Sequence, residues 1–223
     1  RYFFSSSACA YNTDLQKTNE VVALKESDAY PAMAERGYGW EKLVSEMFCE
    51  EYWAERQLET HLARFPNIYG PNGTWFGGRE KAPAAMCRKV LEAQDSGDMR
   101  IEIWGDGEQT RSFCYIDDCL HGIDLIMHTD ELIATPINLG SSEMVSINQL
   151  VDIVEDIAGV KLEREYNLDA PKGVAGRNSD NTFIQEVLGW EPNTPLRNGM
   201  AETYAWIAAQ FADRKAGKRV VEG

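Results

Sequence analysis

The sequence predicts an α/β fold, in which strands and helices alternate along the chain. Short apolar runs alternate with longer segments whose apolar residues recur every three or four positions. The 223 residues are 43% hydrophobic and 26% charged, which is ordinary for a globular chain. The sequence contains no internal repeat or low-complexity tract. These observations exclude a collagen-like or wholly disordered protein.

The first third of the chain predicts a strand, a polar stretch, a helix and a second strand. Tyr2–Ser7 is a short apolar run that ends in serines, which is typical of a buried strand meeting a loop. The polar stretch covers Asn12–Glu35. In Tyr38–Arg56 the apolar spacing predicts a long, well-buried helix. Leu58–Phe65 alternates apolar and polar residues and predicts the next strand.

The middle of the chain contains a long predicted loop. Pro66–Pro83 has 18 residues without a clear pattern, and such loops are uncommon in compact domains unless they are functional. A helix is expected at Ala84–Gln94 and a strand at Ile101–Trp104. The Gly105–Gly107 sequence then predicts a turn.

The last part of the chain continues the alternation. A helix is expected at Asp117–His128, a strand at Ile137–Leu139, and a helix from Ser146 to Ala158. Ser146 and Gln149 fit the N-cap and N3 positions of a capping box. Lys161–Tyr166 alternates like an edge strand, and two helices close the chain.

Charge and cysteine usage limit the partners and the compartment. The formal charge is −14, from 22 Lys and Arg against 36 Asp and Glu, so we expect no nucleic-acid partner. No apolar run approaches the ~20 residues that span a bilayer, so we expect no membrane partner. The five cysteines form no CxxC pair, and with three histidines they show no metal-ligand spacing. We therefore expect no metal and a cytoplasmic location.

Tyr38 and Lys42 lie four residues apart, and hence on one face of the predicted helix. This pair suits removal of a proton from an alcohol: a free tyrosine titrates near pH ~10, and an adjacent ammonium favours the phenolate. The same spacing also arises by chance on solvated helix faces, so the motif alone does not decide between the two interpretations.

The context of this pair resembles a known family. A serine-rich strand end, Ser5–Cys9, precedes the pair, and the segment Arg64–Pro71 follows it. Together they resemble the extended short-chain dehydrogenase/reductase family, whose members act on nucleotide sugars with bound NAD. The resemblance implies the C-terminal part of a Rossmann-like, doubly wound parallel sheet plus a smaller α/β substrate-binding domain. Residues 1–66 would belong to the NAD-binding domain, and residues 67–223 mainly to the nucleotide-sugar domain, with segments that return to the Rossmann sheet.

The family's glycine loop for the dinucleotide pyrophosphate is absent from this sequence. The chain also begins at Arg1 within an apolar run. We therefore expect the chain to be the C-terminal part of a longer protein and to be inactive alone.

Two departures from the commonest family pattern indicate a subgroup. Cys9 puts a thiol near the strand end, and Lys81 adds an ammonium in the long loop. These residues, with the strings Trp104–Phe113, Gly140–Ser146 and Gly176–Asn181, resemble the members that invert two carbons of a GDP-linked hexose. The resemblance implies conversion of GDP-D-mannose to GDP-L-galactose through a 4-keto intermediate.

The resemblance also implies catalytic roles. Tyr38 would act at the C4 hydroxyl, assisted by Lys42 and Ser7, while NAD exchanges the C4 hydride. Tyr38 and Lys42 would also contact NAD. Cys9 would be the base and Lys81 the acid that invert C5 and then C3. A free thiol is only a few per cent thiolate near neutral pH, so a nearby cation such as Lys81 would help. Taken without the resemblance, Cys9 fits a small buried residue and Lys81 a solvated charge.

Further residues would hold the substrate, and arginine's planar fork suits its diphosphate. The resemblance assigns sugar or nucleotide contacts to Ser7, Ala8, Cys9, Asn67, Glu80, Lys81, Lys89, Gln109, Thr110, Arg111 and Arg177. Ala175 stands where the family pattern has another arginine. Trp75 and Phe76 suit either a wall of the sugar site or core packing. By analogy with the family, the protein would be a homodimer formed through the helix that carries Tyr38.

Two other functions remain open from the sequence. A nucleotide-sugar dehydratase or decarboxylase would use Tyr38 and Lys42 without needing Cys9 and Lys81. The other is an inactive, non-enzymatic binding module, since the chain lacks the family's dinucleotide loop.

Overall fold

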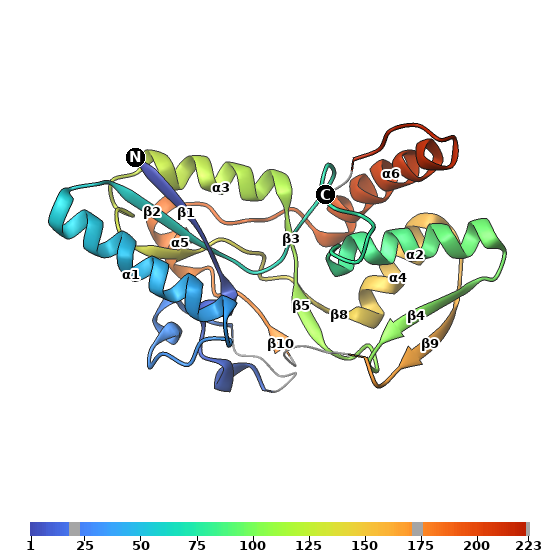
Figure 1. The fold of residues 1–223 in the computed structure, drawn as a ribbon, viewed down its shortest axis with the longest axis horizontal. Helices are drawn as coiled ribbons and strands as arrows, with labels where there is room; N and C mark the ends of the chain where they lie inside the picture. The colour runs from blue at the N-terminus through green and yellow to red at the C-terminus, as the bar shows by residue number, and fades with distance from the viewer. Residues whose placement is uncertain (18–22, 171–175, 222–223) are drawn as a thin grey trace. The chain divides into compact units, whose positions relative to one another are not determined.

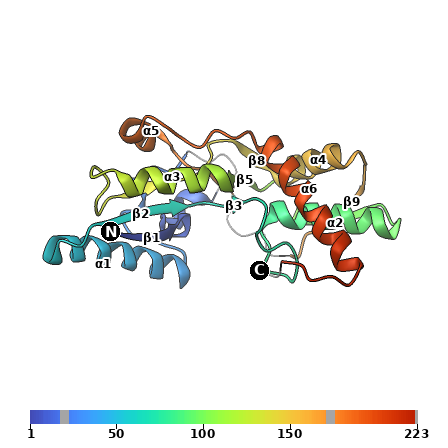
Figure 2. The same cartoon turned by 90° about the horizontal axis from the view of Figure 1, so that it is seen from above.

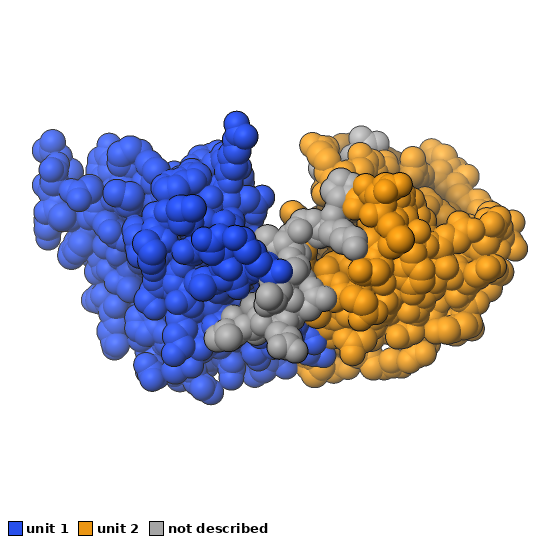
Figure 3. Space-filling view, turned by 90° about the horizontal axis from the view of Figure 1, so that it is seen from below, with its two compact units in different colours: residues 1–68, 112–144, 174–193 blue, residues 69–111, 145–173, 194–223 orange. Residues whose placement is uncertain are grey.

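The computed structural model describes residues 1–17, 23–170 and 176–221. The chain forms two compact units, which are coloured separately in Figure 3. Unit 1 contains residues 1–68, 112–144 and 174–193, and unit 2 contains residues 69–111, 145–173 and 194–223. The assignment of NAD to one domain and the nucleotide sugar to the other stays a prediction.

Unit 1 is built on a parallel sheet of three strands. The order is β1 (Tyr2–Ser7), β2 (Thr60–Phe65) and β7 (Pro136–Asn138). Helix α1 (Tyr38–Arg56) lies on one face of this sheet and α3 (Ile116–His128) on the other, as Figure 2 shows. Helices on both faces of a parallel sheet are the mark of doubly wound α/β folds, so the predicted fold class is confirmed.

Unit 2 combines three helices with a pair of parallel strands. Helices α2 (Ala82–Ser96), α4 (Ile147–Ala158) and α6 (Leu196–Lys215) pack against one another. Strand β4 (Arg100–Trp104) pairs with β9 (Glu163–Asn167), and α2 also packs on β4 (Figure 1). The small α/β arrangement expected from the sequence is therefore present.

Most predicted boundaries agree with the structure to within a few residues. Strand β1 and helix α1 have the predicted bounds, and Ser146 and Gln149 form the predicted capping box at the start of α4. The expected polar stretch 12–35 holds short 3-10 helices, and its residues 18–22 lie outside the described part of the chain. The described residues also form one further helix, α5 (Thr182–Leu188), and three single-turn helices, η1 (Ala8–Ala10), η2 (Thr13–Gln16) and η3 (Glu26–Ala29).

The sequence did not predict five very short strands. Each has only two or three residues, which is too short to show a period. They are β3 (Ile68–Tyr69), β5 (Thr110–Ser112), β6 (Cys114–Tyr115), β8 (Met144–Ser146) and β10 (Gly176–Arg177). Strand β3 lies within the predicted loop 66–83.

Two apolar clusters form the core of unit 1. One lies between the sheet and α3 and α5, and its fully buried members are Ala63, Ile126, Leu132, Ile137, Leu139 and Ile184. The other joins α1 to the segment that follows β1, and includes Ala8, Ala10, Tyr11, Leu24, Ala29, Ala34 and Leu43. The second cluster fixes the chain immediately after the carboxyl end of β1.

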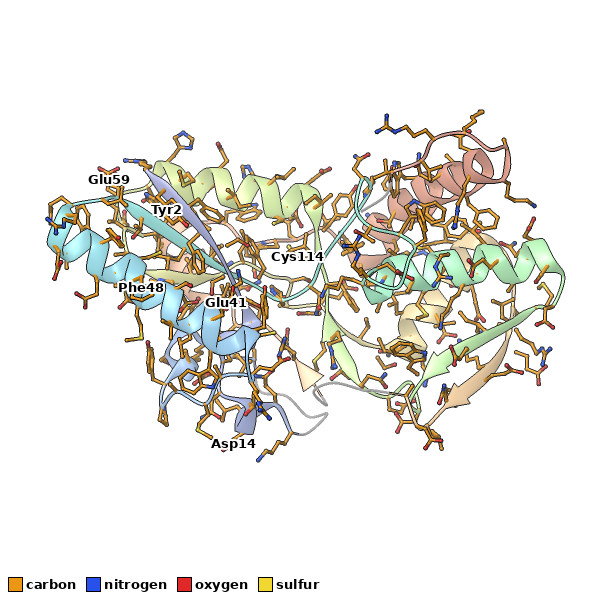
Figure 4. The ribbon with its side chains drawn as sticks, in the orientation of Figure 1. Tyr2, Asp14, Glu41, Phe48, Glu59 and Cys114 are labelled. Carbon is orange, nitrogen blue, oxygen red and sulfur yellow. The ribbon has the colours of Figure 1, made fainter. Side chains whose placement is uncertain are left out.

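The prediction that α1 is well buried is wrong for much of its surface. Leu43 and Cys49 are buried against the unit, but Phe48, labelled in Figure 4, is 61% exposed. The other exposed apolar residues of the helix are Tyr38, Trp40, Val44, Met47 and Tyr52. The apolar residues occupy more than one helix face, and the sheet covers one face only. Among the described residues, no helix is long and apolar enough to cross a bilayer.

His61, the second residue of β2, is expected to make unit 1 sensitive to acid. The residue is fully buried, and neither ring nitrogen has a hydrogen-bond partner among the described residues. Burial lowers the pKa of His61 below its usual 6.5, and the charge of Arg1 lowers it further. Because protonation is easier in the unfolded chain, the free energy of unfolding is largest above pH ~6.5 and falls as the pH drops below it.

We expect His61→Leu to remain more stable than the wild type as the pH falls, because leucine does not bind a proton on unfolding. The wild type loses about 1.4 kcal/mol of unfolding free energy for each pH unit over which only the unfolded chain binds this proton. Urea-induced unfolding at several pH values between about 7 and 5 measures the difference from the wild type. The matched control is Leu62→Met, at the buried apolar position next to His61 in β2, which removes no titratable group and should keep the wild-type pH dependence. Equal pH dependence in wild type and His61→Leu would contradict the explanation.

Candidate active site

The carboxyl end of β1 presents the only thiol that is partly exposed among the five cysteines, all of which lie in described segments. Ser7 ends the strand, and its Oγ accepts a hydrogen bond from the Cys9 backbone N–H at 3.1 Å. This bond caps the short helix Ala8–Ala10, in which Ala8 is buried. The serine-rich strand end thus turns the chain so that Cys9 lies where ligands bind in open parallel sheets.

The first turn of α1 packs directly on this segment. Gly39 has no side chain, and a Cβ at this position would collide with the carbonyl oxygen of Cys9. The same oxygen accepts a hydrogen bond from the backbone N–H of Glu35 at 3.1 Å. Glycine is therefore required beside Tyr38 so that the start of the helix can approach Cys9.

Tyr38 and Lys42 lie together in this first part of α1. The Lys42 Nζ is 5.3 Å from the centroid of the Tyr38 ring and donates a hydrogen bond to the Ser5 carbonyl at 3.1 Å. Tyr38 is 50% exposed, so its phenol is accessible to a ligand. An accessible phenol and an ammonium at the carboxyl end of a parallel strand fit the hydroxyl groups of a dinucleotide cofactor. The structure thus brings together the pair that the sequence predicted.

Behind this pair lies a buried ion pair that sequence analysis missed. Glu46 and Arg64 are each 2% exposed at their side chains, and two Arg64 nitrogens contact the Glu46 carboxylate, at 2.6 and 2.9 Å. Ser6 also donates to Glu46, and the register of β1 and β2 puts Ser6 beside Arg64. Burial alone would lower the pKa of Arg64, but the hydrogen bonds to Glu46 raise it overall. The signal in the sequence was the position of Glu46, four residues after Lys42 on the same helix face.

Arg177 supplies the cation next to Cys9. Its Nη1 donates to the Cys9 Sγ at 3.3 Å, its Nε donates to Gln16 Oε1 at 2.7 Å, and its Nη2 is 3.5 Å from Glu35 Oε2. From the sequence we expected Lys81 in this role and assigned Arg177 to the substrate. Nothing in the sequence indicated that Gln16 and Glu35 contact Arg177, because about 140 to 160 residues separate them from it along the chain. Ala175, where the family pattern has an arginine, lies outside the described residues.

The predicted loop residues lie in unit 2, at the start of α2. Lys81 is the exposed N-cap residue of α2, and its carbonyl accepts a hydrogen bond from the Ala85 N–H at 2.9 Å. Glu80 accepts hydrogen bonds from Arg88 at 2.8 Å and from the Gly78 N–H at 2.7 Å. Burial acts to raise the pKa of Glu80, but hydrogen bonds from its own N–H, Arg88 and Gly78 lower it overall. An ionised Glu80 thus fixes the backbone next to Lys81.

Three other residues of unit 2 that were predicted to contact the substrate donate hydrogen bonds to backbone carbonyls of the same unit. The Lys89 Nζ donates to the Glu102 carbonyl at 2.8 Å. Gln109 donates to the Trp104 carbonyl at 2.9 Å, while its Oε1 is buried with no partner among the described residues. Thr110 and Arg111 follow on β5, where the Arg111 Nη1 donates to the Thr110 carbonyl at 2.6 Å.

Asn67, in unit 1, donates its side-chain amide to the Ser112 carbonyl at 3.2 Å. Ser7, Cys9, Tyr38, Lys42 and Arg177 also belong to unit 1, whereas the contacts from Glu80 to Arg111 belong to unit 2. The roles that connect the two sets stay proposals.

The aromatic pair of the long loop lies in unit 2, with Trp75 buried and Phe76 half-buried. Trp75 is fully buried, and its indole N–H donates to the Val221 carbonyl at 3.2 Å. The Arg214 guanidinium lies 4.1 Å from the centroid of the Phe76 ring. Of the two interpretations left open, the structure supports core packing for Trp75. In the described part of the chain, no three His, Cys, Asp or Glu side chains are grouped so as to hold a metal ion.

Comparison with known proteins identifies the family. The model of the NAD dependent epimerase/dehydratase family matches residues 1–140. The chain belongs to this family, which confirms the resemblance drawn from Ser5–Cys9 and the Tyr38/Lys42 pair.

Within the family, the chain is most informatively compared with an epimerase. It is 49% identical over 216 residues to GDP-mannose 3,5-epimerase of Arabidopsis thaliana, covering 97% of this chain and 55% of the relative. It is also 28% identical over 179 residues to probable GDP-L-fucose synthase 1 of Oryza sativa subsp. japonica, covering 80% of this chain and 54% of that protein. The chain thus spans about half the length of the curated relatives it matches.

Solved structures agree with the fold. UDP-glucose 4-epimerase of Thermotoga maritima with UDP-glucose has a TM-score of 0.80 at 26% identity, covering 94% of this chain and 63% of that chain. UDP-glucuronic acid 4-epimerase of Bacillus cereus in complex with NAD has a TM-score of 0.72 at 25% identity, covering 93% and 61%. The Rossmann-like character of the parallel sheet is therefore confirmed.

Proposed function

We propose that the whole protein converts GDP-D-mannose into GDP-L-galactose by inverting C3 and C5 through a 4-keto intermediate. The observation that supports this proposal best is the partly exposed Cys9 thiol, which contacts Arg177 and lies against the first turn of the helix that carries Tyr38 and Lys42. Similarity to a GDP-mannose 3,5-epimerase over 97% of the chain supports the choice of substrate.

Tyr38 acts at the C4 hydroxyl. Its phenolate takes the hydroxyl proton, and the nearby Lys42 ammonium stabilises the negative charge of the phenolate. Ser7 lies at the same strand end and orients the C4 oxygen by hydrogen bonding. Tyr38 and Lys42 are the residues of this chain that would hold NAD, which would supply hydride transfer at C4.

Cys9 and Lys81 then perform the inversions. A carbonyl at C4 makes the hydrogens on C3 and C5 acidic, because the negative charge left behind delocalises onto the carbonyl oxygen. The Cys9 thiolate takes the proton from one face of C5, and the Lys81 ammonium gives a proton to the opposite face. Exchange with solvent restores both groups before the same steps occur at C3.

Cations hold the GDP moiety despite the net charge of −14. Lys89 and Arg111, both in unit 2, are proposed to contact the diphosphate. Lys89 would provide a compact positive charge, and the planar guanidinium of Arg111 would donate two parallel hydrogen bonds. Ala8, Asn67, Glu80, Gln109, Thr110 and Arg177 complete the proposed substrate contacts. Unit 1 would thus contain the NAD-binding part, and unit 2 most of the nucleotide-sugar part. The exposed apolar face of α1 supports a homodimer formed through that helix.

Cys9→Ala in the whole protein tests the proposal. We expect deuterium exchange from solvent into C5 of GDP-mannose to fall by about 100-fold or more, because the base is removed. Binding of GDP-mannose, measured by calorimetry, should remain detectable. The matched control is Cys119→Ala, which removes a buried thiol in α3 and should leave exchange within about twofold of the wild type. Unchanged exchange in Cys9→Ala would remove Cys9 from the mechanism.

A further inference from the structure

Gln16 is a buried side chain whose two polar atoms are both used. The residue is 1% exposed and ends the short helix Thr13–Gln16 in unit 1. Its Nε2 donates to the Asn12 carbonyl at 3.3 Å, and its Oε1 accepts from Arg177 Nε at 2.7 Å. Because a guanidinium has only donors, the amide atom that faces it must be the oxygen. The orientation of the Gln16 amide is therefore fixed from both ends.

The contact with Gln16 sets the direction of the whole guanidinium. The group is planar, so a fixed Nε also fixes where Nη1 and Nη2 point. In this orientation Arg177 Nη1 is 3.3 Å from the Cys9 Sγ, and Nη2 is 3.5 Å from Glu35. Glu35 is half exposed at its side chain, and an ion pair of this kind contributes little to holding a side chain. The buried hydrogen bond to Gln16 is the stronger constraint.

The neutral charge of Gln16 also matters. A carboxylate in its place would hold Arg177 but would offset the positive charge that Cys9 experiences. An amide oxygen orients the guanidinium without adding a second negative charge to that of Glu35. A cation that hydrogen-bonds with a sulfur favours the thiolate over the thiol, and the thiolate is the form that acts as a base or nucleophile.

We propose that Gln16 is a positioning residue, which holds Arg177 against Cys9 and thereby keeps Cys9 reactive. The inference rests on the proposed function in one respect, which is the role of Cys9 as the base. The effect on the thiol itself does not depend on that role and can be measured without substrate.

Alkylation of the whole protein by iodoacetamide near neutral pH gives the first measurement, with Cys9 followed by mass spectrometry. Cys9 is partly exposed and the other four cysteines are buried, so Cys9 should react first. We expect Gln16→Leu to slow labelling of Cys9 by about fivefold or more, because Arg177 is no longer held against the sulfur. General loosening of the structure would instead speed labelling and expose the buried thiols. The matched control is Gln185→Leu, at an exposed position on α5, which should leave the rate unchanged.

A double-mutant cycle with Arg177→Met separates positioning from other effects. Methionine has no hydrogen-bond donor on its side chain, so in this background Gln16 has no group to hold. We expect Gln16→Leu to change the labelling rate by less than about twofold there, against about fivefold with Arg177 present. Gln16→Met provides a second variant, with an unbranched side chain that lacks the acceptor, should Gln16→Leu unfold.

Turnover then distinguishes this inference from the proposed function. Slower labelling together with a comparable fall in kcat supports the inference. An unchanged labelling rate, or equal effects of Gln16→Leu in both backgrounds, overturns it while leaving the role of Cys9 intact. Slower labelling with full turnover shows that Gln16 controls Cys9 but contradicts the proposed role of Cys9 as the base.

Discussion

Arg64→Met is expected to lower the free energy of unfolding by about 3–5 kcal/mol, because it leaves the Glu46 carboxylate buried without its ionic partner. The substitution also removes the hydrogen bond from Arg64 to the Glu26 carbonyl at 2.7 Å and the contact of the guanidinium with the Tyr11 ring at 4.9 Å. These contacts join α1, β2 and the segment that follows β1. Their loss should therefore destabilise the part of unit 1 that carries Cys9 and Tyr38. Urea-induced unfolding followed by tryptophan fluorescence measures the loss.

The double variant Arg64→Met/Glu46→Leu is the control for this prediction. It removes both charges, and apolar pairs of similar volume often replace a buried ion pair at little cost. We expect the double variant to recover most of the stability lost in Arg64→Met. A double variant as unstable as the single one would show that packing, and not the unpaired carboxylate, accounts for the loss.

Tyr38→Phe is expected to lower formation of the proposed 4-keto sugar by about 100-fold or more, because it removes the group that we propose takes the C4 hydroxyl proton while keeping the ring. The ketone can be trapped with borodeuteride, which places deuterium on C4. Tyr38 lies in the exposed first turn of α1, so the substitution should cost little stability. Exchange at C5 should be lost as well, since it requires the C4 carbonyl.

Tyr52→Phe is the matched control, at an exposed tyrosine further along the same helix. It should leave trapping of the ketone within about twofold of the wild type. Normal trapping in Tyr38→Phe would contradict the assignment of Tyr38. Loss of C5 exchange with normal trapping of the ketone is the pattern expected of Cys9→Ala, so the two substitutions separate oxidation from proton transfer.

The long elements could be predicted from the sequence because their patterns are local. Helix α1 and strand β1 have the predicted bounds, and the Ser146/Gln149 capping box marks the start of α4. The burial of α1 could not be predicted, because apolar residues on several helix faces do not reveal which face the sheet covers. The short strands were missed because two or three residues show no period.

The Tyr38/Lys42 pair could be predicted from spacing on one helix, and family resemblance pointed to Cys9. The contacts that surround these residues join distant segments and left no pattern in the sequence. Arg177 and Gln16 are 161 residues apart, and Arg64 reaches Glu46 only because β2 and α1 pack together. Side-chain partners of this kind are set by tertiary packing, so only the structure could show that Arg177 is the cation next to Cys9.

We propose that this chain forms part of an enzyme that inverts C3 and C5 of a GDP-linked hexose by removing a proton from each carbon and returning one to the opposite face. The most direct test incubates the whole protein with GDP-D-mannose in deuterated water and examines the sugar by NMR spectroscopy. We predict GDP-L-galactose that carries deuterium at both C3 and C5. A product without deuterium at these carbons, or one that has lost water and kept a carbonyl at C4, would contradict the claim.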